Sequence, residues 1–428
     1  MKNFTILVSL IFSTFCSVVS AQVFSNGVYV LNEGGFAANN ASVSFLSNTG
    51  ELQNNIFSFV NAGTSLGDTA QYMAFNGTRA YIVLNGSGSI RVVNRYTFEL
   101  EQTITGFVNP RYIAFYQGSL FVSCWGDPVN SFDDYVAVVD VATNLITTTI
   151  SVAEGPERMI EKSGKIYVAH FGGYGFGSSV SVIDVVNLAV LSTIAVGDVP
   201  NSLVENDGVL YVLCGGKPSW SGAETFGSLT KYDLNLNTII TTIAFSNQHP
   251  SNLRIDEENL YYSAENNIYT VNVSSATLPN EPLIVITQPQ GAYGVYGMDI
   301  IDSKIYVADA GNFSENGRAY IYSNEGVLLN TFIVGVIPNG FYKVEPNLSQ
   351  LKFNTPQIVA VYPNPTSEYF HLNVEKQASI KIYDISGRLV KVHNYTGNAV
   401  EVLDLKKGLY LVEITIESQV LTKTIIIN

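Results

Sequence analysis

Apolar and polar residues alternate along the chain in short runs, and one run recurs through most of the sequence. It consists of an aromatic residue followed by two apolar or small residues. The copies are on average about 46 residues apart, close to the ~40–45 residues of a four-stranded propeller blade. We therefore predict one β-strand at each copy and one blade around it. The copies begin at Tyr29, Tyr81, Phe121, Tyr167, Tyr211, Tyr261 and Tyr306.

Three further runs accompany each aromatic run. A second alternating run follows, clearest in 135–140 and 179–184, and a third run rich in Thr and Ile follows that, as in 190–196. The fourth run is usually opened by proline. Turn residues separate the runs, and no helical stripe of useful length interrupts them. The predicted fold class is therefore all-β, a seven-bladed β-propeller. The prolines are Pro110, Pro156, Pro200, Pro250 and Pro338.

The order of the runs predicts how the ring closes. The repeats begin with an aromatic run at 27–31 and end with a proline-led run at 339–344. Joining these two runs in one blade leaves no terminal blade with an unpaired edge. An open solenoid of β units is the alternative, but it needs polar capping repeats that the sequence lacks.

The two ends of the chain differ from the repeats. Residues 1–21 have Lys2, an apolar run and small residues before Gln22, and predict a signal peptide rather than a membrane anchor. Residues 22–345 form the predicted propeller, and the polar residues 346–358 a linker. Residues 359–428 contain short alternating runs and predict a small C-terminal β-sandwich.

Composition narrows the class of protein. Charged residues make up only 14% of the chain and aromatic residues 12%, which disfavours a disordered chain or a coiled coil. The net charge of −14 argues against a nucleic-acid partner. After signal cleavage no apolar stretch is long enough to span a bilayer. Cys124 and Cys214 fall in non-adjacent blades, so we expect buried free thiols rather than a disulfide.

Long loops gather on one predicted face. The connections after the aromatic runs, such as 124–134 and 214–227, emerge at the same rim as the proline-led loops. Aromatic residues among a few polar groups in such loops favour a ligand-binding face. The alternative is that these side chains only pack the loops together. The candidate ligand-binding residues are Phe36, Arg111, Trp125, Asp127, Arg158, His170, Tyr174, Trp220, His249 and Arg318.

Catalytic and metal-binding motifs are not found in the sequence. There is no nucleophile elbow, no paired histidine spacing and no Cys-x-x-Cys. Cys124, His170, Cys214 and Asp309 share one position of the repeat, but sevenfold geometry spreads them around the ring. Asp127 lies in an acidic loop without EF-hand spacing. We therefore predict no catalytic or metal-binding residue, and the sequence assigns no cofactor.

The repeat resembles a known family. The pattern of Tyr167-Val168, then 179–184, then Thr193 to Pro200 is similar to YVTN-type seven-bladed propeller repeats, over about residues 25–345. The opening residues 31–35 are similar to secreted YncE-like propellers of Bacteroidetes. The resemblance implies a ligand-binding module, such as one that captures a corrinoid for a TonB-dependent transporter. Alternatives are a lactonase- or lyase-like enzyme and an adhesin that binds protein or glycan.

The C-terminal segment carries a second resemblance, to the type A C-terminal sorting domain of the type IX secretion system. This resemblance implies passage through the periplasm, the type IX machinery as partner, and release or attachment at the cell surface. A carbohydrate-binding or fibronectin-like module is the alternative. The motif residues are Tyr362, Pro363, Asn364, Pro365, Asp384, Gly387, Arg388, Gly408 and Tyr410.

Overall fold

The computed structural model describes residues 23–130, 132–287, 294–346, 359–374, 377–416 and 419–428. The predicted signal peptide and almost all of the predicted linker lie outside these residues. The chain divides between Pro346 and Asn347 into two compact units. Within the described residues, no helix has the length and apolarity needed to cross a membrane.

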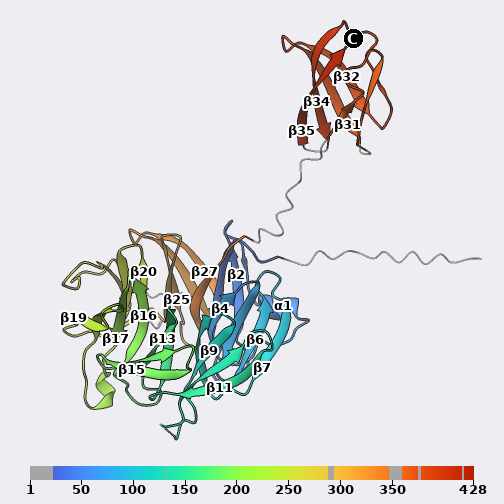
Figure 1. Cartoon of the computed structure of the whole chain (residues 1–428). Coiled ribbons are helices and arrows are strands. Elements are labelled where there is room, and N and C mark those ends of the chain that lie inside the picture. The colour runs from blue at the N-terminus through green and yellow to red at the C-terminus, as the bar shows by residue number, and fades with distance from the viewer. Residues whose placement is uncertain (1–22, 131, 288–293, 347–358, 375–376, 417–418) are drawn as a thin grey trace, which may run out of the picture. The chain divides into compact units, whose positions relative to one another are not determined.

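The described residues of the first unit form seven four-stranded antiparallel sheets, the blades of a propeller (Figure 1). In six blades the four strands follow one another along the chain, and in the seventh the last strand of the unit joins the first three. The first four blades contain β28 (Pro338–Val344), β1 (Gly27–Asn32), β2 (Ser42–Ser47) and β3 (Leu52–Gln53); β4 (Ala70–Asn76), β5 (Arg79–Leu84), β6 (Ser89–Asn94) and β7 (Leu100–Thr105); β8 (Pro110–Tyr116), β9 (Ser119–Cys124), β10 (Tyr135–Asp140) and β11 (Leu145–Ser151); and β12 (Pro156–Lys162), β13 (Lys165–His170), β14 (Ser179–Asp184) and β15 (Ala189–Ala195). The other three contain β16 (Pro200–Asn206), β17 (Val209–Cys214), β18 (Ser228–Asp233) and β19 (Thr238–Ala244); β20 (Pro250–Asp256), β21 (Asn259–Ala264), β22 (Asn267–Asn272) and β23 (Ile284–Val285); and β24 (Gly297–Ile301), β25 (Lys304–Asp309), β26 (Asn316–Ser323) and β27 (Leu328–Val336).

The innermost strands of the blades form a closed ring. In the order β28, β4, β8, β12, β16, β20 and β24, each strand contacts the next, and β24 contacts β28. Strand β1 pairs with β28, with Gly27 opposite Val344 and Tyr29 opposite Tyr342. The predicted closure by the first and last runs of the repeat region is therefore confirmed.

The recurring aromatic strand is the second strand of every blade, and it is buried on both faces. In β5, for example, Tyr81, Ile82 and Val83 are all fully buried. Neighbouring blades stack on its two sides, so Tyr81 and Val83 share a core cluster with residues of β9. Because both faces are covered, the aromatic strand is mostly apolar, which is why it is the clearest signal in the sequence.

Several elements differ from the expectation in detail. A short helix, α1 (Ile56–Val60), lies between β3 and β4 and buries Ile56 and Phe57. A single 3-10 turn, η1 (Ser219–Ser221), lies in the loop after β17. Strand β26 begins at Asn316, so Arg318 lies within a strand rather than in a loop. These segments are too short for a periodic pattern, so hydrophobic periodicity could not place them.

The second unit contains two β-sheets around one apolar core that includes Ile380, Ile382, Val412 and Ile414. The strands of this unit differ in length, and the shortest have only two residues. The strands are β29 (Val361–Tyr362), β30 (Tyr369–Leu372) and β33 (Val400–Glu401) in one sheet, and β32 (Leu389–Tyr395), β31 (Ala378–Asp384), β34 (Gly408–Ile416) and β35 (Gln419–Ile427) in the other.

Polar residues of the C-terminal motifs fix the turns of this unit. The Asn364 side chain donates to the carbonyl of Thr424 and accepts from the amide of Ile426, which ties the segment after β29 to β35. The Asp384 carboxylate accepts hydrogen bonds from the Ser386 hydroxyl and the Arg388 amide, and these lower its pKa to about 2. Gly387 has a φ of 81°, a left-handed conformation that favours glycine in this turn.

Candidate functional site

A cavity of about 540 Å³ lies along the axis of the propeller. The innermost strands of all seven blades contribute to its wall. A volume of this size is typical of small-molecule pockets. We call this cavity the channel.

A β-bulge in the innermost strand determines which side chains line the channel. In β12 the register with β13 shifts between Pro156 and Met159, so Glu157 and Arg158 both face the cavity although they are consecutive. Similar shifts occur near the start of β4, β8, β16, β20 and β28. Bulges re-aim side chains in this way next to binding sites. In six of the innermost strands the position directly after the opening residue is occupied by Gln71, Arg111, Glu157, Asn201, Ser251 and Asn339, and in the seventh blade Tyr296 lies just before β24.

The backbone just before these strands is unusual. Thr69, Val199 and Ile337 are β-branched, yet they have φ values of 55°, 57° and 53°. Such residues rarely adopt this conformation, because their side chains crowd the backbone. The carbonyls of these residues accept hydrogen bonds from the residue just past the aromatic strand, as in Glu33 N–H to Ile337 at 2.7 Å. The loops at the mouth of the channel are thus tied together by backbone bonds.

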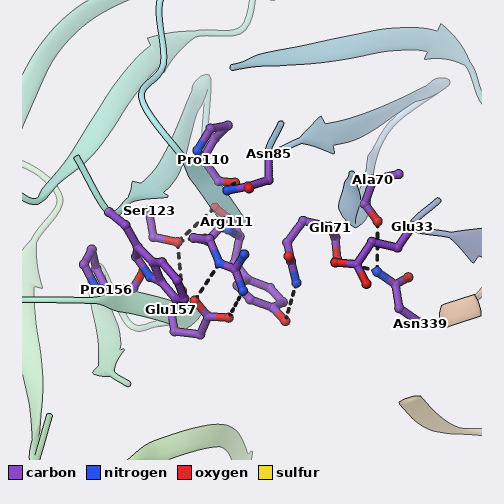
Figure 2. A network of polar contacts seen from close by, with 12 residues as sticks. Glu33, Ala70, Gln71, Asn85, Pro110, Arg111, Ser123, Pro156, Glu157 and Asn339 are labelled. Atoms are coloured by element: carbon purple, nitrogen blue, oxygen red, sulfur yellow. Dashed lines mark hydrogen bonds and ion pairs between the residues drawn. The ribbon is translucent and has the colours of Figure 1, made fainter. Parts of the chain in front are cut away.

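Side chains also join each blade to the next around the channel. Asn339 donates to the Ala70 carbonyl at 2.9 Å, and Asn85 donates to the Pro110 carbonyl at 3.2 Å (Figure 2). The Trp125 indole donates to the Pro156 carbonyl at 3.1 Å. Because buried carbonyls need partners, these bonds stabilise the blade order and the shape of the channel.

The strongest polar contact in the channel joins Arg111 of β8 to Glu157 of β12 (Figure 2). Two parallel hydrogen bonds of 2.9 and 2.8 Å connect the guanidinium to the carboxylate, and the side chains are only 15% and 9% exposed. Burial opposes the charge on Arg111, but Glu157 outweighs that effect and raises its pKa. The guanidinium also lies 4.0 Å from the centre of the Trp125 ring. Arg111 thus links the channel to the aromatic residues above it.

A second ion pair joins neighbouring blades lower in the channel. Arg254 of β20 lies 3.1 Å from the Asp299 carboxylate of β24 and donates to its neighbour's carbonyl, that of Leu253. Glu33 lines the channel as well, and its carboxylate accepts a 2.6 Å hydrogen bond from the Tyr296 hydroxyl. Burial raises the pKa of Glu33.

Arg158 has different surroundings from the other two arginines. Its guanidinium lies 4.6 Å from the centre of the Tyr112 ring, and Tyr72 and Tyr342 line the same part of the channel. Burial lowers the pKa of Arg158, but the nearby tyrosines and Glu157 raise it overall. Among the residues that the structure describes, none forms a hydrogen bond or an ion pair with this guanidinium.

Aromatic residues of the long loops lie at the mouth of the channel. The Trp125 and Phe171 rings stack 6.2 Å apart with an angle of 11°, and Tyr174 meets Trp125 edge-on at 5.7 Å. Phe171 also lines the channel. Further out, Trp220 is 80% exposed and contacts Phe176. We call the loops 33–41, 125–130 with 132–134, 171–178, 215–227 and 310–315 the loop face.

The structure places six of the ten predicted site residues in the channel, at its mouth or on the loop face. Arg111 and Arg158 line the channel. Trp125 lies at its mouth. Exposed residues of the loop face are Phe36, Tyr174 and Trp220.

The remaining candidates are partly or wholly engaged within the fold. His170 is only 1% exposed and shares a hydrogen bond with Ser181, and burial lowers its pKa to about 4. His249 is held by the Gly215 carbonyl and Glu224. Asp127 accepts from the amide of Val129, and Arg318 is half-buried in β26. The structure therefore does not bring all ten residues together.

Sequence reasoning missed much of the channel wall. Glu157, Arg254 and Asp299 were not among the candidates, nor were the tyrosines at positions 72, 112 and 342. A signal was present, because polar residues follow the proline of the fourth run in blade after blade. This signal was missed because the prediction of strands assumes that side chains alternate between two faces. The bulge breaks this two-residue period.

The two cysteines of the propeller are unpaired within the described residues. Cys124 and Cys214 are buried free thiols, and burial raises the pKa of both to about 12. Within that part of the chain, no group of three or more His, Cys, Asp or Glu side chains is placed to hold a metal ion.

Fold and site together define a β-propeller with an axial channel, joined to a second β-rich unit. The chain belongs to the family described as "Domain of unknown function (DUF5074)", whose model matches residues 26–325. Residues 360–428 match the secretion system C-terminal sorting domain. This domain marks proteins that the type IX system secretes to the cell surface or beyond it, which confirms the predicted localisation and the type IX machinery as partner.

Solved structures with low sequence identity share the fold. A quinonprotein alcohol dehydrogenase-like protein from Bacteroides thetaiotaomicron has 15% identity and a TM-score of 0.57, over 75% of this chain and 79% of that one. A functionally unknown protein from Desulfotomaculum acetoxidans has 12% identity and a TM-score of 0.55, over 76% and 100%. Kuenenia stuttgartiensis hydrazine synthase has 15% identity and a TM-score of 0.50, over 77% and 96%. No curated protein matches the chain. These likenesses support the propeller fold, and the finer YVTN and YncE resemblance stays a prediction.

Proposed function

We propose that the propeller is an extracellular binding module that takes a small organic ligand on its loop face. The observation that carries the proposal is the continuity between the face and the channel. Phe171 stacks on Trp125 at the mouth and also lines the cavity below. A ligand on the aromatic residues can therefore extend a group into a polar, walled space.

The exposed aromatic residues support a binding role over simple loop packing. Trp220 and Phe36 expose most of their surface, although burying a large apolar side chain is favourable. Trp125, by contrast, is held in place by Arg111 and Phe171. The face thus combines a rigid aromatic centre with exposed aromatic residues around it, an arrangement typical of binding surfaces.

In its specific form, the proposal is that the ligand is a corrinoid handed to a TonB-dependent transporter. In this form the corrinoid ring lies on the aromatic residues of the loop face and extends a side group into the channel. This form rests on the family resemblance and on the aromatic face.

Calorimetric titration of the purified chain with cyanocobalamin tests this form. We expect saturable binding at micromolar concentration, weakened about tenfold by Trp220→Ala because an aromatic contact at the face is lost. Leu236→Ala is the matched control, since Leu236 is 72% exposed in the β18–β19 turn at the opposite end of the blades. Absence of heat with cyanocobalamin would exclude the corrinoid, and equal binding by both variants would exclude the loop face.

A further inference from the structure

We infer that the channel contains an anion-binding site centred on Arg158, for a small molecule with a carboxylate or phosphate group. The inference goes beyond the proposed function, because the site lies below the loop face and does not depend on what the face binds. It rests on the charges of the channel wall and on how they are paired.

Two of the three channel arginines already have carboxylate partners. Arg111 forms the two-bond pair with Glu157, and Arg254 is paired with Asp299. Each pair brings its two charges within hydrogen-bond distance, so neither guanidinium has strong attraction left for a further anion.

Glu33 provides the remaining carboxylate of the channel wall, and this carboxylate does not pair with Arg158. It accepts the Tyr296 hydroxyl at 2.6 Å, and the nearby charges that shift its pKa are Arg111 and Glu157. Burial raises the pKa of Glu33, which disfavours its charged form. Arg158 is therefore a channel cation with no carboxylate bonded to it within the described part of the chain.

The position of Arg158 leaves its N–H groups available. The guanidinium lies over the face of Tyr112. This cation–π contact stabilises the positive charge, but it uses none of the N–H donors of the guanidinium. An arginine has five N–H donors in a planar fork that matches a carboxylate or a phosphate. Such a group is costly to leave unpaired in a partly enclosed site. An anion in the channel supplies the missing partner.

The local backbone explains why this side chain faces inward. The bulge in β12 turns two consecutive residues toward the axis, so Glu157 reaches back to Arg111 and Arg158 reaches the tyrosines. Without the bulge, strand alternation would send one of the two to the opposite face of the sheet.

The wall around Arg158 limits the kind of anion. The rings of Tyr72, Tyr112 and Tyr342 surround the site, and the cavity holds about 540 Å³. One unpaired arginine favours a single anionic group, and the rings favour a flat or apolar body attached to it. The chain has a net charge of −14, so the attraction for an anion is confined to this site.

The test is calorimetry on the intact chain at low salt with three probes: benzoate, its neutral counterpart benzamide, and inorganic phosphate. We expect benzoate or phosphate to bind, and Arg158→Gln to weaken that binding about tenfold or more. The better of the two anions identifies the group that the site prefers. Benzamide is expected to bind wild type and variant equally.

Arg79→Gln is the matched control, because it removes an arginine charge from an ion pair with Glu101 on the surface. We expect it to leave anion binding unchanged. Should Arg158→Gln fail to fold, Arg158→Lys keeps the charge without the planar fork, and we expect a smaller loss. Equal anion affinity for wild type and folded Arg158 variants, or no heat from either anion at millimolar concentration, would overturn the site. Cyanocobalamin binding to Arg158→Gln separates this failure from failure of the loop face.

Discussion

Pro156, Glu157 and Arg158 are consecutive residues with three different surroundings. The Pro156 carbonyl accepts the Trp125 indole, Glu157 pairs with Arg111, and Arg158 lies over Tyr112. A regular strand would place alternate residues on opposite faces, but the bulge turns two of them inward. At the scale of the residue, the channel is therefore built by a local departure from strand geometry.

The buried pair between Arg111 and Glu157 gives the first prediction. Glu157→Gln leaves the Arg111 charge buried without a carboxylate, so we expect the free energy of unfolding of the propeller to fall by about 3 kcal/mol. Urea unfolding followed by circular dichroism measures the change. Glu205→Gln is the control, since Glu205 pairs with the more exposed Lys162, and we expect a loss of less than about 1 kcal/mol. Equal losses of unfolding free energy in the two variants would show that burial of the Arg111–Glu157 pair does not raise the cost of breaking it.

Asp134 gives a prediction about pH. Burial raises its pKa to about 6, although its hydrogen bond from the Gly155 amide lowers it. The folded-state pKa lies above the unfolded value of about 4, so ionisation of Asp134 destabilises the fold. The contribution of Asp134 to the free energy of unfolding therefore decreases as pH rises from about 4 to 6. We expect Asp134→Asn to remove this decrease, so that the variant gains stability relative to wild type across that range.

Melting temperatures of the wild type and Asp134→Asn between pH 4 and 7 measure this difference. The comparison must be made between variants, because His170 has the opposite effect. Its lowered pKa of about 4 means that stability is lost as pH falls from about 6.5 toward 4. Parallel pH profiles for wild type and Asp134→Asn would show that the Asp134 carboxylate is not perturbed.

At the scale of the element, strand β28 has two roles. It completes the blade that begins with β1, and it contributes Asn339 and Tyr342 to the channel. The propeller ring closes only through this strand, because β24 and β4 both contact it. Propellers that end in this way depend on the last strand to remove an open edge.

Truncation of the chain tests the role of β28. A chain ending at Val336 lacks β28, and we expect it to lose the single cooperative thermal transition of the propeller. A chain ending at Pro346 keeps β28 and lacks only the second unit, so we expect it to melt at nearly the same temperature as the propeller of the full chain. Cooperative melting of the shorter truncation by calorimetry would contradict closure through this strand.

The elements were predicted from the sequence to very different extents. The aromatic strands could be found because each is buried between two blades and must stay apolar, as Tyr81 to Val83 illustrate. The channel wall could not be found, because its residues differ from blade to blade and the bulge breaks alternation. Helix α1 was not predicted, because its five residues are too few to show a helical period of apolar positions. Positions that pack the core carry similar residues in every blade, whereas positions that line the channel carry different residues from blade to blade.

At the scale of the whole molecule, the two units have separate tasks. The second unit matches a sorting domain, and its motif residues Asn364 and Asp384 hold its turns. The propeller carries the channel and the loop face. Sorting is therefore assigned to the second unit, and the proposed ligand binding to the propeller.

Deleting residues 359–428 tests this division. We expect the truncated protein to fold and to accumulate in the periplasm, while the full chain reaches the surface or the medium. Cell fractionation with antibodies against the propeller measures the distribution. Asp127→Asn, a change on the loop face, is the control and leaves delivery unchanged. Surface delivery of the truncated chain would refute the sorting role.

The most direct test of binding at the loop face uses the tryptophans themselves. The chain has only two, Trp125 and Trp220, and both lie on that face, so their fluorescence reports on it alone. The measurement is tryptophan emission during titration with cyanocobalamin and a soluble glycan, corrected for absorption with free tryptophan. We predict a saturable change with at least one probe, reduced in Trp220→Phe. Unchanged emission with both probes at millimolar concentration would contradict a small-ligand binding face.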